Sequence, residues 1–140
     1  LLYYWPVSYM QISYEANAIK NFVAKKELSI LDVGSGPAPA SAALCDAFSV
    51  KNVTMIDSSK KALNLAEKIF KPEWKDCKVQ TIVHNFESGQ MPLVSEKYDI
   101  IVLSHSLNEL WKNKTDFWKN RKWKMKQTRL LKLKTLIAKE

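Results

Sequence analysis

The chain has 140 residues, of which 46% are hydrophobic and 26% charged, proportions that suit one globular domain and exclude collagen-like, low-complexity and disordered sequences. The longest uncharged apolar stretch, residues 1–14, is interrupted by Pro6 and is too short to cross a bilayer, so we expect no membrane partner. The two cysteines provide neither a disulfide framework nor a four-cysteine metal site, so we expect reduced thiols and no metal.

The formal net charge of +8 is concentrated in one part of the chain. Residues 1–110 carry 11 Lys and Arg against 12 Asp and Glu, whereas residues 111–140 carry 11 against 2. Such a basic segment is typical of an arm that contacts nucleic acid, although a solvated helix face has the same composition. We therefore divide the chain into a core, 1–110, and a basic helical tail, 111–140. Because it begins with Leu, we expect it to be a piece of a longer protein.

The first predicted element is a helix over residues 9–24, where Ile12, Ala16, Ile19 and Val23 recur at helical spacing. Four β-branched, apolar runs of strand length follow it, at 29–33, 53–57, 79–84 and 99–104. These runs are continuous rather than alternating, as in parallel strands that are covered on both faces.

Two helices are predicted between these strands. The first covers the Ala-rich residues 40–48, after prolines that suit the first turn of a helix. The second covers residues 60–70, with an N-cap at Ser58 or Ser59 and an end at Pro72. The alternation of strands and helices predicts a Rossmann-like, three-layer α/β sandwich with a mainly parallel sheet.

Two of the three glycines lie directly after the first predicted strand, in the run LDVGSG that ends at Gly36. Glycine there lets the backbone turn sharply and approach a ligand, and the free N–H groups of the next helix favour a negatively charged group. Asp57 ends the second strand, where a carboxylate accepts hydrogen bonds from ribose hydroxyls. Together these features predict a nucleoside-containing ligand.

Two details distinguish between nucleoside ligands. A dinucleotide fingerprint needs a third glycine where this chain has Pro39, and Asp32 is unfavourable beside a pyrophosphate. An ammonium or sulfonium group would instead be attracted by Asp32. The D-x-G-x-G pattern, followed by a strand that ends in an acid, resembles class I methyltransferases, and this resemblance implies S-adenosylmethionine as the cofactor. The family's third glycine corresponds to Ala38 here. A NAD-dependent oxidoreductase is the disfavoured alternative.

The runs LDVGSGPAPASAAL and YDIIVLSHSLNELW together resemble the small-ribosomal-subunit methyltransferase-like family, which has mitochondrial and bacterial members. The resemblance covers residues 3–111. It implies an S-adenosylmethionine-dependent methyltransferase that acts on small-subunit ribosomal RNA, with that RNA or the small subunit as its partner, in a bacterial cytoplasm or the mitochondrial matrix. The alternative is a non-catalytic ribosome-assembly factor with the same fold.

The same resemblance implies how the methionine end of the donor is bound. Gly34, Ser35 and Gly36 would surround it, and Asp32 would face its ammonium group directly or through water. The structural alternative for these residues is a tight turn without a ligand.

For the nucleoside end and the methyl acceptor, the resemblance implies a second set of residues. Asp57 would bind the ribose hydroxyls, with Ser58 and Asn85 near the adenine. Ser104 and His105 would lie where the acceptor is met, as candidate catalytic residues. A helix cap, a turn residue and an ordinary hydrogen-bonding residue are the alternatives for Asp57, Asn85 and His105.

The methyltransferase fold usually has the strand order 3-2-1-4, which places the fourth strand at an edge. If the chain is truncated after that strand, residues 100–103 are exposed, and we expect self-association unless the C-terminal segment covers them.

Two further helices are predicted in the tail region, 108–119 and 129–139, the second of which fits an edge strand nearly as well. The aromatic residues there would stack on unpaired bases, pack on the sheet, or have no role: Trp111, Phe117, Trp118 and Trp123.

Overall fold

The computed structural model describes residues 3–23, 27–85, 92, 94 and 97–104. In chain order these form α1 (Tyr4–Ile19), the 3₁₀ turn η1 (Lys20–Phe22), β1 (Leu28–Val33), α2 (Pro39–Ala47), β2 (Val50–Asp57), α3 (Lys60–Glu73), β3 (Lys78–Val83) and β4 (Ile100–Val102). All the strand pairs are parallel, and the sheet has the order β3-β2-β1-β4. The predicted Rossmann-like α/β fold and its strand order are confirmed.

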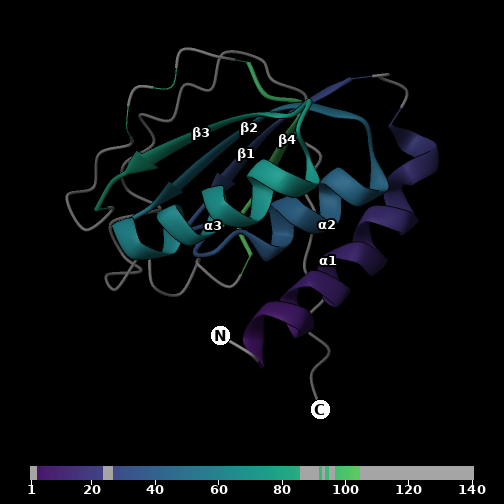
Figure 1. The fold of residues 1–140 in the computed structure, drawn as a ribbon. Helices are drawn as coiled ribbons and strands as arrows, with labels where there is room; N and C mark the ends of the chain where they lie inside the picture. Colours follow the sequence, from purple (N-terminus) through teal and green to yellow (C-terminus); the bar gives the residue numbers. More distant parts are fainter. Residues whose placement is uncertain (1–2, 24–26, 86–91, 93, 95–96, 105–140) are drawn as a thin grey trace, which may run out of the picture.

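The three helices α1, α2 and α3 lie on the same face of the sheet (Figure 1). The main core fills the space between them and the strands, with Phe70, Leu63 and Met55 among its fully buried side chains. The opposite face carries a smaller apolar cluster, in which Tyr98 lies against β1 and β2. Successive side chains of a strand point to opposite faces of the sheet. Ile30 of β1 belongs to the main core on the helix side, so Asp32, two residues later, points to the same side.

The start of α1 differs from the prediction. The helix begins at Tyr4 because Pro6 lies in its first turn, where the missing backbone N–H leaves no intrahelical bond unmade. It ends at Ile19, before the predicted end at residue 24, and the chain continues as η1.

The end of α3 also differs, because Pro72 lies inside the helix rather than ending it. The last turn is closed by the N–H of Trp74, which donates to the carbonyl of Phe70 at 2.9 Å. At the other end, the side chain of Ser59 accepts a hydrogen bond from the N–H of Ala62 at 3.3 Å, as predicted for the N-cap.

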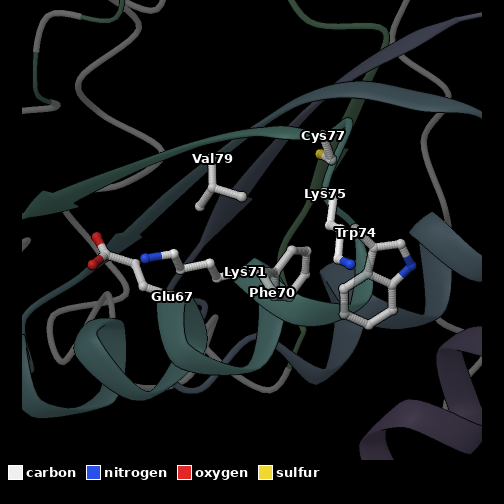
Figure 2. Close-up of a pocket in the computed structure, with 7 residues that line it drawn as sticks. All are labelled: Glu67, Phe70, Lys71, Trp74, Lys75, Cys77 and Val79. Carbon is white, nitrogen blue, oxygen red and sulfur yellow. The ribbon is translucent and has the colours of Figure 1, made fainter.

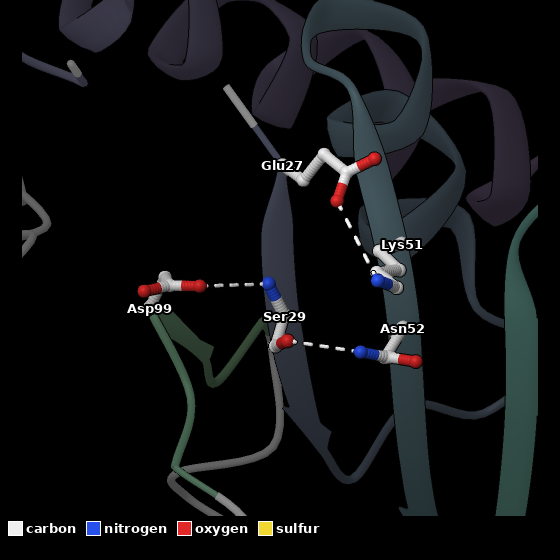
Figure 3. Close-up of polar contacts among 5 residues, drawn as sticks. All are labelled: Glu27, Ser29, Lys51, Asn52 and Asp99. Atoms are coloured by element: carbon white, nitrogen blue, oxygen red, sulfur yellow. Dashed lines mark hydrogen bonds and ion pairs between the residues drawn. The ribbon is translucent and has the colours of Figure 1, made fainter. Parts of the chain in front are cut away.

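Polar contacts near the start of β1 fix its register against both neighbouring strands (Figure 3). The N–H of Ser29 donates to Oδ2 of Asp99 at 2.9 Å, and the carbonyl of Ser29 accepts from the N–H of Asp99 at 2.8 Å. Nδ2 of Asn52 donates to Oγ of Ser29 at 3.1 Å. The nearby ion pair between Lys51 and Glu27 is more than 60% exposed on both sides and contributes little. Because all the strands are parallel, their carboxyl ends lie at the same edge of the sheet.

Within the described ranges, no helix is long and apolar enough to cross a membrane. β4 lies at an edge of the described sheet, and self-association through it stays a prediction. The two predicted helices of the tail region, and the division at residue 110, lie outside the described residues.

Candidate functional site

The register of the strands brings the predicted site residues to one edge of the sheet. Val33 of β1 is level with Ile56 of β2, so Gly34 is level with Asp57. On the other side of β1, Asp32 is level with Val102 of β4. The turn after β1 therefore meets the ends of β2 and β4.

The remaining predicted residues extend from this edge. Ser58 and Asn85 follow β2 and β3 and are exposed, and Ser104 follows β4 and is half-buried. His105 lies outside the described residues. The proposed roles of these four residues stay predictions.

The turn between β1 and α2 requires left-handed backbone at three positions: Gly34 (φ 70°), Gly36 (φ 54°) and Ala38 (φ 57°). Glycine adopts this conformation readily, whereas Ala is strained in it by about 1–2 kcal/mol. Ala38 is nevertheless held there, because its side chain is fully buried in the main core and its N–H donates to the carbonyl of Ser35 at 2.9 Å. The backbone at this position therefore has a conformation that glycine, the third glycine of the family motif, would adopt with less strain than Ala38.

Helix α1 also holds this turn. Nε1 of Trp5 donates to the carbonyl of Pro37 at 3.1 Å, and the Trp5 ring stacks on Tyr9 with ring centroids 5.4 Å apart. The N-terminal helix therefore contacts the glycine turn directly.

The backbone N–H groups of the turn are occupied by the protein itself. Those of Gly34 and Ser35 donate to the carbonyl of Ile56 at 2.7 and 3.1 Å, and that of Gly36 donates to Oδ2 of Asp57 at 2.8 Å. None of these three N–H groups is therefore free to bind a negatively charged ligand.

The first turn of α2 is equally unsuited to an anion. Pro39 is its first residue and has no N–H, and the N–H of Ser41 is bonded to the Asp32 carboxylate. A phosphate at this helix terminus would lack donors at both positions, and it would meet the Asp32 carboxylate instead. The prediction that free N–H groups of this helix favour a negatively charged ligand is therefore wrong at Pro39 and Ser41.

Asp32 is a buried carboxylate, only 1% exposed, beneath this turn. Its Oδ2 accepts a hydrogen bond from Oγ of Ser41 at 2.6 Å, whereas its Oδ1 has no partner among the residues that the structure describes. Burial raises the pKa of Asp32 to about 6, although the bonds from Ser41 oppose this rise. An unpaired buried acceptor is costly, so a cationic group near the turn would be stabilised here.

Asp57 links the turn to the start of the next helix. Its Oδ2 accepts from Gly36 and its Oδ1 accepts from the N–H of Ser59, both at 2.8 Å. Asp57 therefore makes the contacts of a helix cap at the strand end, which is the structural alternative to a ribose-binding role. Because a carboxylate has about four acceptor positions, Asp57 retains capacity for ribose hydroxyls.

There is also open space beside the turn. A Cβ added to Gly36 would meet no atom within 4 Å, so glycine is needed there for its backbone conformation and not because of a neighbouring side chain. A ligand can approach the backbone of Gly36 closely.

Ser41 and Trp5 belong to the site but were not assigned from the sequence. Ser41 is the only hydroxyl residue in the run PASAAL, a signal that a polar partner faces it. No spacing marks Trp5, because its contact with Pro37 joins segments 32 residues apart.

The family described as Methyltransferase domain matches residues 30–123 of the chain. Among solved structures, the chain is similar to a candidate S-adenosyl-L-methionine-dependent methyltransferase from Methanococcus maripaludis, with a TM-score of 0.59 and 21% identity over 80% of this chain and 50% of that one. It is also similar to the plantazolicin methyltransferase BpumL in complex with SAH, with a TM-score of 0.57 and 21% identity over 81% of this chain and 40% of that one. A third similar structure is coclaurine N-methyltransferase bound to N-methylheliamine and SAH, with a TM-score of 0.52 and 15% identity over 67% and 26% of the two chains.

These likenesses show the fold. The chain spans about half the length of the first of these structures and less of the others. No curated protein sequence matches the chain.

Proposed function

The chain belongs to the methyltransferase-domain family, and on that premise we propose that it binds S-adenosylmethionine and transfers its methyl group to small-subunit ribosomal RNA. The donor would lie at the carboxyl edge of the sheet, against the turn between β1 and α2. A methyl donor of this kind carries positive charge on its sulfonium and ammonium groups and has no phosphate.

The observation that carries this proposal is the charge and hydrogen-bonding character of the turn. Its N–H groups at Gly34, Ser35 and Gly36 are all satisfied internally, while Asp32 leaves a buried oxygen without a described partner. A pyrophosphate needs N–H donors and is repelled by carboxylates, whereas a cationic donor needs acceptors. The site therefore supports S-adenosylmethionine over NAD.

The residues present fit the donor. The Asp32 carboxylate would attract the ammonium group, and the open space beside Gly36 would receive the methionine end. Asp57 would accept from the ribose hydroxyls with its remaining lone pairs, and Ser58 and Asn85 would lie near the adenine.

When bound, the donor supplies a methyl group on an already activated sulfonium, so this chain needs to contribute mainly alignment. Holding the donor and the acceptor in line can supply several kcal/mol of the barrier. Ser104, two residues after β4, is the described residue that we propose to meet the acceptor.

Small-subunit ribosomal RNA is proposed as the acceptor for two reasons. The run from Tyr98 to Trp111 resembles the small-ribosomal-subunit methyltransferase-like family, and the segment 111–140 is strongly basic. Lysines with interleaved aromatic residues neutralise phosphates and stack on unpaired bases.

Calorimetric titration of the chain with S-adenosylmethionine, its demethylated product and NAD tests the donor. We expect heat with the first two and none with NAD; heat with NAD alone would overturn the assignment. Incubation with methyl-labelled donor and isolated small ribosomal subunits then tests the acceptor. Donor binding without transfer of label to the RNA would favour the non-catalytic assembly factor.

A further inference from the structure

The two cysteines of the chain lie together at the end of α2 that is remote from the glycine turn. Cys45 is in the last turn of α2, and Cys77 directly precedes β3. Both side chains pack against the main core, and each thiol lies close enough to the other to shift its pKa. They are therefore neighbours in space although 32 residues separate them in sequence.

Hydrogen bonds hold the two segments in place. Nε1 of Trp74 donates to Oδ1 of Asp46 at 3.2 Å, which joins the end of α3 to the residue after Cys45. The N–H of Cys77 donates to the carbonyl of Trp74 at 3.1 Å. The contact between the thiols is thus part of an ordered corner of the fold.

Cys77 lines a cavity in the described part of the chain, and Cys45 is not among the lining residues of that cavity. Figure 2 shows a pocket of about 250 Å³ between α3 and β3, with Cys77 on its wall beside Phe70 and Trp74. Lys71 and Lys75 also line it and are exposed. Glu67 lines it as well, and its Oε1 accepts a hydrogen bond from Oγ1 of Thr81 at 2.6 Å. The pocket therefore offers a thiol, apolar surface and an excess of positive over negative charge to a small anionic molecule.

The contact makes the two thiols chemically unequal. The hydrogen bond from Cys45 lowers the pKa of Cys77, and the same contact together with burial raises the pKa of Cys45. Because the thiolate is the nucleophile, Cys77 is the thiol that reacts first. Cys45 is the neighbouring thiol that reacts second.

We propose that Cys77 and Cys45 form a thiol–disulfide exchange site for small anionic disulfides. In the first step the Cys77 thiolate attacks one sulfur of the disulfide, forms a mixed disulfide and releases the other half as a thiolate. In the second step Cys45 loses its proton to solvent and attacks Sγ of Cys77, which releases the second thiolate. Overall, two protein thiols are oxidised to one disulfide, and the small disulfide is reduced to two thiols.

This inference is independent of the methyl donor, because the site is at the opposite end of α2 from the glycine turn. It is also compatible with thiols that are reduced in the resting protein, since disulfides in reducing compartments are usually transient.

The test uses the reduced full chain, glutathione disulfide as the probe, and alkylation followed by peptide mass mapping. We expect the wild type to yield the peptide containing Cys45 linked to the peptide containing Cys77. Cys45→Ser should stop at a stable mixed disulfide on Cys77, whereas Cys77→Ser should react at least tenfold more slowly. Equal rates for the two variants, or wild-type protein in which both cysteines remain alkylated, would overturn the proposal.

The role of the pocket charges is tested with Lys71→Glu. We expect slower reaction with glutathione disulfide and an unchanged rate with the uncharged hydroxyethyl disulfide. Lys61→Glu, an exposed lysine at the start of α3 that does not line the pocket, is the matched control. If both variants slow the reaction equally, overall charge rather than the pocket determines the rate, and the pocket part of the proposal is wrong.

Discussion

The backbone N–H of Gly36 donates to Oδ2 of Asp57 at 2.8 Å, so the carboxylate at the end of β2 holds the turn at the end of β1. This contact joins the two halves of the motif on which the ligand prediction rests. The carboxylate orders the turn whether or not a ribose is present, so its removal affects both stability and binding.

Asp57→Ala should therefore lower the free energy of unfolding by about 1–3 kcal/mol, because the N–H groups of Gly36 and Ser59 lose their acceptor. Donor affinity should fall by a similar free energy. Urea unfolding and calorimetric titration with S-adenosylmethionine measure the two effects. Asp76→Ala, which removes an exposed carboxylate between α3 and β3, is the control and should change neither. Unchanged affinity in Asp57→Ala would remove this residue from the site.

The buried carboxylate of Asp32 should make stability depend on pH. Its pKa is about 6 in the folded chain and 3.8 without burial, so between these values the folded state binds more protons than the unfolded state. Stability should consequently fall as pH rises through this window, by at most about 1.4 kcal/mol per pH unit. Urea unfolding of wild type and Asp32→Asn at about pH 4, 5, 6 and 8 measures this effect. The difference in unfolding free energy between the two proteins should show this slope. A difference that is constant with pH would contradict the assignment.

A cationic donor should favour the charged form of Asp32. Binding of S-adenosylmethionine near pH 6 should then release protons, and its affinity should rise with pH through the pKa of about 6. Calorimetry in two buffers of different ionisation enthalpy measures the protons released. Asp32→Asn should abolish the release, and a release that persists in this variant would assign it to another group.

The left-handed backbone at Ala38 should tolerate glycine but not a β-branched residue. Ala38→Val should lower the free energy of unfolding by about 2–5 kcal/mol, because it combines a strained φ with overpacking of a fully buried position. Ala38→Gly should change it by less than about 1 kcal/mol, since relief of strain offsets the lost methyl contacts and the greater freedom of the unfolded chain. Urea unfolding compares the two variants, and equal losses would argue against strain at this position.

Trp5→Phe should loosen the glycine turn while it preserves an aromatic ring in α1. The carbonyl of Pro37 loses its donor, which should cost about 0.5–1.5 kcal/mol of stability and weaken donor binding severalfold. Tyr4→Phe, at a neighbouring residue that is 75% exposed, should have no effect on either measurement. If donor binding by Trp5→Phe equals that of wild type, α1 does not position the turn.

The strands followed from the sequence because runs such as 29–33 and 53–57 are apolar and β-branched. Their order followed from the resemblance to class I methyltransferases. The N-cap at Ser59 followed from local chemistry. The position of Pro72 misled the prediction of the end of α3, because this proline does not prevent the last turn from closing. The start of α1 was missed because the apolar spacing used to predict that helix begins only at Ile12.

The sequence predicted that the glycine turn, Asp32 and Asp57 lie close together, but it did not predict their hydrogen bonds. That the N–H groups of the turn are directed to Ile56 and Asp57 depends on how close β1 lies to β2, which no local pattern encodes. The partner of Asp32 is on α2, and the donor to Pro37 is on α1. Such contacts between separate elements become visible only when the elements are placed in space.

The pairing of β4 with β1 joins Ser29 to Asp99 across 70 residues of chain, whereas β1, β2 and β3 are connected in sequence by α2 and α3. Closing so long a loop has a high entropic cost before any contact forms. β4 should accordingly dock late in folding, after the β1-α2-β2-α3-β3 unit has assembled, and its backbone amides should exchange with solvent hydrogen sooner than those of β2.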